Sequence, residues 1–111
     1  MTTDDTHQKR FAVGYFRSRR SNDPATENLD RQIRAYAVAH GYAIITIYRD
    51  EGELARIGAQ PSLTKAISQI EQRKSAYLII PTWHHLARRL DSAEQIINRI
   101  RSYDGYVISI G

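Results

Sequence analysis

Basic side chains that could hold a phosphate group gather in two short segments of the sequence. The first, residues 17–20, carries Arg17, Arg19 and Arg20, and the second, residues 84–89, carries two adjacent histidines and two adjacent arginines. Most of the 16 basic residues of the chain are arginine, whose planar guanidinium group binds phosphate or carboxylate oxygens in pairs. The two segments predict an anion site if the fold brings them together, and a solvated charged rim is the alternative.

The elements that would position these segments alternate between strands and helices. Apolar and β-branched runs predict strands over residues 11–17, 42–49, 76–80 and 106–110. Helical apolar stripes predict helices over residues 26–40, from Pro61, and from Asp91, where the spacing from Asp91 to Glu94 is typical of a capping box. Residues 50–60, which are polar and contain two glycines, are expected to form a mobile loop.

Strands that are separated by helices pair in parallel, so the expected fold class is α/β. We expect three α/β/α layers around a mainly parallel, flavodoxin-like sheet. Ligands of such sheets bind beyond the carboxyl ends of the strands. Residues 17–21, 50–60 and 81–89 follow three of the predicted strands, so the basic residues converge on that edge.

Length and composition predict one domain, over residues 11–111 of the 111, behind a disordered lead-in over residues 1–10. The chain has no cysteine, which excludes disulfides, thiolate metal sites and cysteine nucleophiles. No apolar run approaches the roughly 20 residues of a membrane span, and the N-terminus lacks a signal-peptide core. We therefore expect a cytoplasmic protein without membrane contact. The net charge of +4 permits nucleic-acid contact without requiring it.

Several short motifs follow one another in a specific order. They are Tyr15-Phe16-Arg17 at the end of the first strand, Leu29-Asp30-Arg31-Gln32, the passage Gly41 to Asp50-Glu51-Gly52, Gln60-Pro61-Ser62-Leu63, and an apolar strand followed by Leu86-Ala87-Arg88. Together they resemble the catalytic domain of the serine recombinases, the resolvase/invertase family, over residues 12–110. The resemblance implies the resolvase catalytic-domain fold. It also implies a reaction in which a serine hydroxyl attacks a DNA phosphodiester while arginines stabilise the phosphoryl charge.

The chain departs from the family pattern at most of the working positions. Arg19 stands where the family carries its nucleophilic serine, and a guanidinium group cannot attack. Leu54-Ala55 replaces a Ser-Gly pair, Gln60 replaces the loop arginine, and His84-His85 replaces an Asp-Arg pair. We therefore predict no catalytic residue. The predicted phosphate- or DNA-binding residues are Arg17, Arg19, Arg20, Gln32, His85 and Arg88.

Two serines could substitute for the missing nucleophile. Ser18 lies one residue from the family position, and it would point to the opposite side of the sheet if the strand extends that far. Ser21 lies two residues further along the turn. The alternative interpretation is that both are ordinary loop serines.

The histidine pair and its neighbour Trp83 permit several interpretations. The histidines could ligate zinc with Asp50 or Glu51, could transfer protons near neutral pH, or could be surface residues that become cationic in mild acid. Adjacent residues diverge on a helix, which disfavours the metal site. We predict neither a metal nor a cofactor. Trp83 is either a core residue, which we favour, or an exposed stacking platform.

Our leading hypothesis is a recombinase domain that has lost DNA cleavage and serves as a binding or interaction module, with nucleic-acid backbone or another protein as partner. The alternative is an active DNA recombinase domain that uses Ser21 or Ser18 and a partner-supplied DNA-binding domain. The third reading, a nucleotide or small-anion binder, is disfavoured because no glycine-rich phosphate loop is present. No long dimerisation helix or recognition helix is expected in the chain. A homo-oligomer, or a complex with a related recombinase, would therefore use the sheet edge or the helix at residues 91–104.

Overall fold

Strands and helices alternate along the chain as the sequence predicts. The computed structural model describes residues 10–20, 23–56, 58–72 and 75–111. Two 3-10 helices, η1 and η2, interrupt the alternation. The order is β1 (Arg10–Ser18), α2 (Pro24–His40), β2 (Tyr42–Glu51), η1 (Gly52–Ala55), α3 (Pro61–Glu71), β3 (Tyr77–Ile80), η2 (Trp83–His85), α4 (Leu90–Ser102) and β4 (Tyr106–Ser109).

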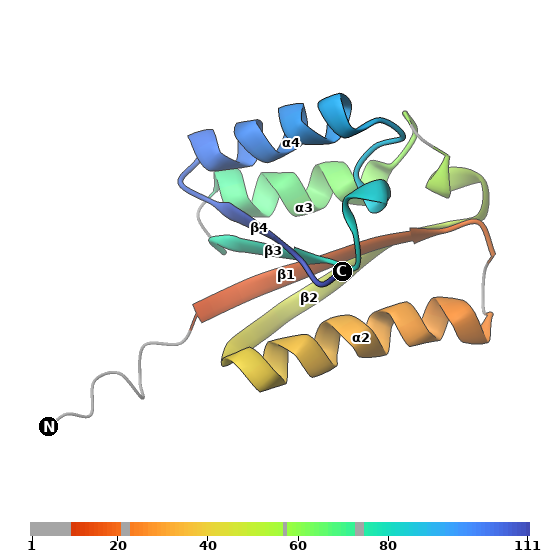
Figure 1. Cartoon of the computed structure of the whole chain (residues 1–111), viewed down its shortest axis with the longest axis horizontal. Helices are drawn as coiled ribbons and strands as arrows, with labels where there is room; N and C mark the ends of the chain where they lie inside the picture. The colour runs from red at the N-terminus through yellow and green to blue at the C-terminus, as the bar shows by residue number, and fades with distance from the viewer. Residues whose placement is uncertain (1–9, 21–22, 57, 73–74) are drawn as a thin grey trace, which may run out of the picture.

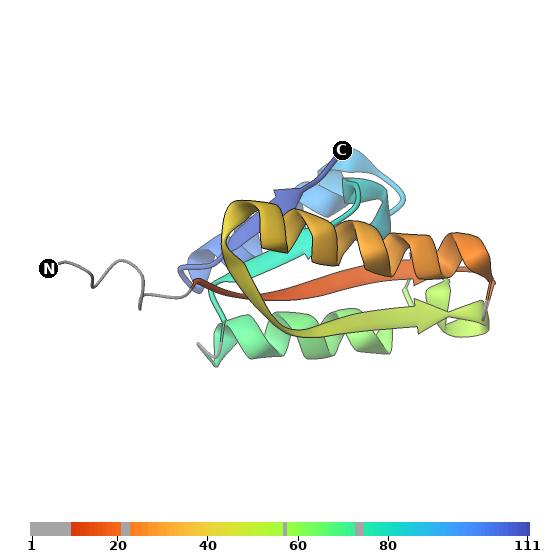
Figure 2. The ribbon, with the colours of Figure 1, turned by 90° about the horizontal axis from the view of Figure 1, so that it is seen from below.

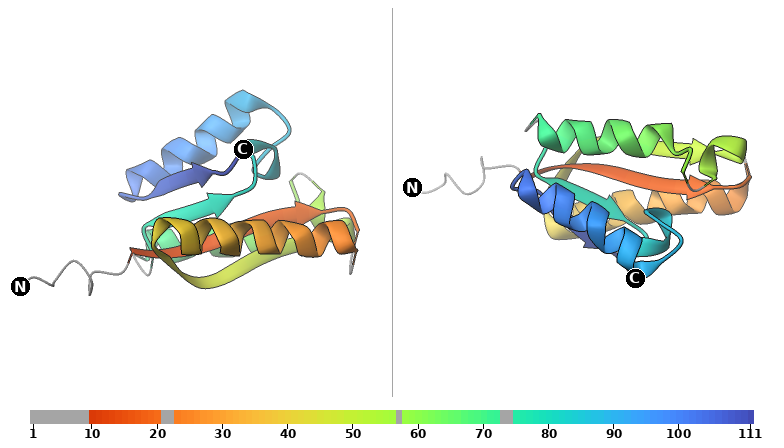
Figure 3. Two further views of the ribbon diagram at one scale, coloured as in Figure 1. Left: turned by 60° about the horizontal axis from the view of Figure 1, so that its bottom comes forward. Right: turned by 90° about the horizontal axis from the view of Figure 1, so that it is seen from above.

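The strands form one four-stranded sheet in the order β2-β1-β3-β4. All three strand pairs are parallel. Helix α2 covers one face of the sheet, and α3 and α4 lie side by side over the other (Figures 1 and 3). The predicted α/β class, the three layers and the parallel, flavodoxin-like sheet are therefore confirmed.

The sheet separates two apolar cores, and the alternation of β1 assigns its residues to them. Val13 and Tyr15 pack towards α3 and α4, whereas Ala12 and Phe16 pack towards α2. Seen from below, α2 lies in front of the sheet (Figure 2). A Cβ atom on Gly14 would lie 2.8 Å from Cγ2 of Ile33, so this glycine permits the close approach of the helix.

Strand β2 is longer than the sequence predicts, and this corrects the expected loop at residues 50–60. Asp50 and Glu51 pair with Arg17 and Ser18 of β1, and the next four residues form η1. The prediction was wrong there because the buried Asp50 carboxylate is satisfied by hydrogen bonds instead of by water.

Near the N-terminus, strand β1 begins at Arg10, which was expected to belong to the lead-in. The remainder of the expected lead-in, residues 1–9, lies outside the described residues.

Helix α4 begins without the capping box that was expected at Asp91. Its N-cap is Arg89, which makes no side-chain capping bond. Asp91 lies inside the first turn, where its carboxylate accepts from the backbone N–H of Ser92 and from Arg89. Among the helices that the structure describes, none combines the length and the apolar character needed to cross a bilayer.

Candidate anion site

The carboxyl ends of β1, β2 and β3 meet at a cavity of about 310 Å3 that is lined by arginine. Its described lining residues are Arg17, Arg19, Arg56 and Arg88. Arg17 is in β1, Arg19 follows this strand, Arg56 ends η1 and Arg88 follows η2. The fold therefore brings together three of the predicted binding residues, Arg17, Arg19 and Arg88, and adds a fourth arginine.

Arg17 is held in place by backbone carbonyl groups. Its Nε and Nη2 donate to the carbonyl oxygen of His84 at 3.2 and 3.1 Å, and its Nη1 donates to that of Ala55 at 3.2 Å. These bonds tie η1 and η2 to the end of β1. Because no carboxylate takes part, Arg17 remains a fixed, uncompensated positive charge at the cavity wall.

The other three lining residues, Arg19, Arg56 and Arg88, keep their guanidinium groups free. All three are exposed, and within the described part of the chain none of the three guanidinium groups has a hydrogen-bond or ion-pair partner. Like charges that gather in one cavity repel one another, and a bound anion would offset that repulsion. The arrangement can hold a phosphate group by charge-assisted hydrogen bonds.

Two of the predicted binding residues lie elsewhere. Arg20 forms an ion pair with Asp23 at 3.5 Å and has a largely exposed side chain. Gln32 is exposed on α2, the helix that covers the face of the sheet opposite to α3 and α4. Neither residue lines the arginine cavity, so their predicted binding role has no support from the geometry.

His85 is packed against the backbone of Arg17 instead of lying free on the surface. Its ring is partly buried, and its Nδ1 accepts a hydrogen bond from the backbone N–H of Arg17 at 3.0 Å. Burial, together with the positive charge of Arg17 and the neighbouring His84, lowers the pKa of His85 to about 4. The interpretation of His85 as a surface residue that becomes cationic in mild acid is therefore wrong, because the neutral ring is the form that accepts the bond.

A buried hydrogen-bond network supports this edge of the sheet. The Asp50 carboxylate accepts from the Tyr15 hydroxyl at 2.8 Å and from the backbone N–H of Ser62, in the first turn of α3, at 3.0 Å. Gln60 Nε2 donates to the Tyr15 hydroxyl and to the carbonyl of His85, each at 3.0 Å. Burial raises the pKa of the Tyr15 hydroxyl, so this oxygen stays protonated. The network fixes β1, β2, α3 and η2 relative to one another.

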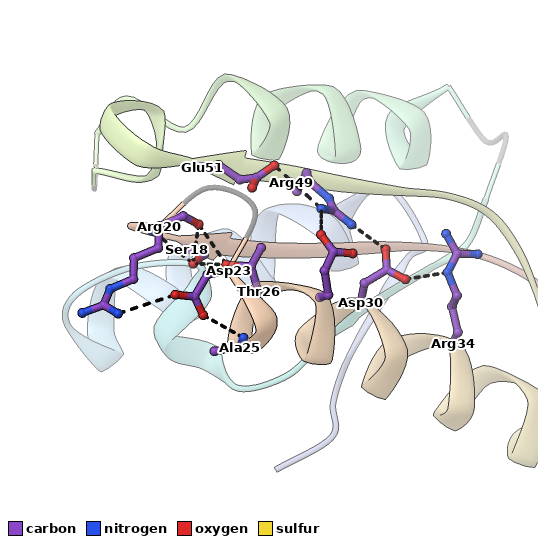
Figure 4. Close-up of polar contacts among 10 residues, drawn as sticks. Ser18, Arg20, Asp23, Ala25, Thr26, Asp30, Arg34, Arg49 and Glu51 are labelled. Atoms are coloured by element: carbon purple, nitrogen blue, oxygen red, sulfur yellow. Dashed lines mark hydrogen bonds and ion pairs between the residues drawn. The ribbon is translucent and has the colours of Figure 1, made fainter.

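Ser18 points away from the arginine cavity. Its Oγ lies 2.7 Å from Oγ1 of Thr26 in α2 and donates to the carbonyl of Arg20 at 3.1 Å (Figure 4). Because β1 extends to Ser18, its side chain falls on the α2 face while that of Arg17 falls on the other. The predicted orientation of Ser18 is confirmed. Ser21 lies outside the described residues.

A cluster of ion pairs joins α2 to the edge strand β2. Arg49 donates to the carboxylates of Glu27 and Asp30 at 3.0 and 2.8 Å, and Asp30 also pairs with Arg34 (Figure 4). Partial burial opposes ionisation of Asp30, but the hydrogen bonds from Arg34 and Arg49 outweigh it and lower its pKa. This cluster lies on the α2 face of the sheet and holds α2 on β2.

The remaining features of the histidine segment are structural. The ring of His84 stacks on Trp83 at 3.9 Å between centroids. Trp83 is partly buried against the core on the α3 and α4 side, which agrees with the favoured interpretation. Across the described ranges, no group of three histidine, aspartate or glutamate residues could hold a metal ion.

Sequence reasoning missed Arg56. The available signal was its position in residues 50–60, one of the three segments expected at the carboxyl edge of the sheet, and its basic side chain. Gln60, and not Arg56, stands where the family pattern has its loop arginine. The structure shows Gln60 buried in the hydrogen-bond network and Arg56 in the cavity.

Comparisons with known proteins agree with this fold. Residues 12–111 match the family described as Resolvase, N terminal domain. A resolvase family site-specific recombinase from Streptococcus pneumoniae superposes with a TM-score of 0.78 at 18% identity, over 92% of this chain and 72% of that chain. The catalytic domain of ISC1926 TnpA, an IS607-like serine recombinase, superposes with a TM-score of 0.77 at 21% identity, over 90% of this chain and 70% of that chain. The catalytic domain of TP901-1 integrase superposes with a TM-score of 0.76 at 19% identity, over 91% of this chain and 78% of that chain. No curated protein sequence matches the chain.

Proposed function

This chain belongs to the resolvase N-terminal domain family, the catalytic domains of serine recombinases, and on that premise we propose that it binds nucleic-acid backbone without cleaving it. The observation that carries the proposal is the arginine cavity at the carboxyl edge of the sheet. A phosphate needs fixed positive charge and N–H donors, and guanidinium groups supply both. Serine recombinases act on DNA, so a DNA backbone phosphate is the natural ligand of a cavity at this edge.

The absence of cleavage is proposed from the position of the hydroxyl groups. Cleavage needs an oxygen that loses its proton and reaches the phosphorus atom. Arg19, which occupies the nucleophile position by the resemblance, has no such oxygen. Ser18 is bonded on the α2 face, and the Tyr15 hydroxyl is buried and protonated. These placements support a binding module over an active recombinase domain.

Binding is tested with a fluorescent DNA duplex titrated by anisotropy across a salt series from about 50 to about 200 mM. We expect affinity to fall steeply with salt. An Arg56→Gln/Arg88→Gln variant should bind at least about tenfold more weakly and should reduce the salt slope by about one. The matched control is Arg31→Gln/Arg101→Gln, which removes the same charge from exposed arginines outside the cavity.

Two outcomes would contradict the proposal. Equal losses of DNA affinity in the cavity variant and in the control variant would mean that net charge, and not the cavity, governs binding. A covalent protein–DNA adduct on supercoiled plasmid that disappears in Ser18→Ala or Ser21→Ala would mean that cleavage is retained. In that case the alternative function, an active DNA recombinase domain with a non-standard serine, would hold.

A further inference from the structure

The arginine cavity carries more positive charge and more free donors than an internal backbone phosphate can use. Four guanidinium groups line it, and no carboxylate is among its described lining residues. Three of the four, those of Arg19, Arg56 and Arg88, have no partner in the described part of the chain. An internal phosphodiester offers one negative charge and two non-bridging oxygens, so one diester would leave part of this donor set unused.

A phosphomonoester fits the donor set better. It carries a charge of about −1.5 to −2 at neutral pH and presents three terminal oxygens. Each free guanidinium fork can engage two oxygens side by side, so three forks and three oxygens can satisfy one another. Arg17, whose N–H groups are held by the carbonyls of Ala55 and His84, adds fixed charge without needing an oxygen of its own.

A neighbouring cavity limits how a nucleic-acid strand can continue from the site. This second cavity, of about 450 Å3, shares Arg19 and Arg56 with the first and adds Gly52 and Glu53. The Glu53 carboxylate can accept from a sugar hydroxyl or a base amino group, but it repels a second phosphate. The cationic surface is therefore bounded on this side and does not form a continuous track for backbone phosphates.

From these two features we infer that the arginine cavity binds the terminal phosphomonoester of a nucleic-acid strand, with the terminal nucleotide directed towards Glu53. This inference rests on the proposed function, because it assigns the class of phosphate that the same cavity takes. It adds a preference for strand ends that backbone binding alone does not require.

The test compares short single-stranded oligonucleotides of one sequence that carry a phosphate at the 5′ end, a phosphate at the 3′ end, or hydroxyl groups at both ends. Fluorescent oligonucleotides with an internal dye are titrated at constant ionic strength near pH 7.5. We expect one of the phosphorylated forms to bind about tenfold more tightly than the hydroxyl form. The preference should disappear in Arg56→Gln/Arg88→Gln and persist in the control Arg31→Gln/Arg101→Gln.

The outcomes separate this inference from the proposed function. Equal, salt-sensitive binding of all three oligonucleotides would overturn the terminal-phosphate assignment and leave backbone binding intact. No binding of any oligonucleotide or duplex would overturn both. Inorganic phosphate that competes as strongly as the phosphorylated oligonucleotide would also overturn the assignment to a strand end, since it would make the free ion the ligand.

Discussion

Acid should destabilise this protein through His85, over a window that its hydrogen bond defines. The neutral ring accepts from the backbone N–H of Arg17 through Nδ1, and a proton on that nitrogen would break the bond and place a charge beside Arg17. The pKa of His85 falls from the ordinary 6.5 to about 4 in the folded state. Between these two pH values the unfolded chain therefore binds more protons than the folded one. The contribution of His85 to the free energy of unfolding is fully present above about pH 6.5 and is lost as the pH falls towards 4.

The size of the effect follows from the same two values. At about 1.4 kcal/mol for each tenfold change in proton affinity, the interval from 6.5 to about 4 corresponds to about 3 kcal/mol. Because part of the His85 ring is exposed to solvent, we expect the free energy of unfolding to fall by about 1–3 kcal/mol over this window. Urea denaturation at closely spaced pH values from about 7.5 to about 4 measures the free energy of unfolding over this window.

The control is His85→Asn, whose side-chain oxygen can accept from the same N–H but cannot titrate. The difference between the two stability profiles removes the contribution of carboxylates that protonate in both proteins. We expect the wild type to lose stability relative to this variant only below about pH 6.5. Parallel profiles would refute the reasoning, because they would mean that His85 has the same proton affinity in the folded and unfolded states.

Two further predictions concern the interactions that hold the site and its scaffold. Asp50→Asn should lower the free energy of unfolding by about 1–3 kcal/mol in urea denaturation, because one carboxylate oxygen accepts from the backbone N–H of Ser62 and the other from that of Leu63, so the amide NH2 must face one of these donors. An unchanged midpoint would contradict a role for the carboxylate. Arg49→Met should cost about 1 kcal/mol at low salt by removing the ion pairs with Glu27 and Asp30, and the difference from wild type should shrink at about 1 M salt. A loss that is independent of salt would assign the effect to packing.

The fold could be predicted from the sequence because its signals are local and repeated. Apolar strand runs and helical stripes alternate along the chain, and the parallel sheet follows from that order. The end of β2 could not be predicted, because Asp50 reads as a loop residue unless its partners are known. These partners are Tyr15 and the first turn of α3, and the tertiary fold alone brings them into contact.

The candidate site was predicted in its location and only in part in its composition. Placing loops at the carboxyl edge of the sheet gathers Arg17, Arg19 and Arg88. It cannot tell which residues of a loop turn towards the cavity, so Arg56 was missed. It also cannot reveal that Arg20 is drawn away by Asp23. Gln32 was assigned from family resemblance alone, and the structure places it on the helix that covers the other face.

Binding and cleavage place different demands on this edge of the sheet. Binding needs positive charge that is already fixed, and Arg17 has it because backbone carbonyls, which are part of the fold, hold its guanidinium group. Cleavage needs in addition a hydroxyl on the same face of the sheet as this charge. Because side chains alternate along β1, Ser18 lies on the opposite face from Arg17, and the position two residues beyond Arg17 shares its face. Arg19 at that position supplies no hydroxyl on the face of Arg17, and its guanidinium group adds a fourth cation to the cavity.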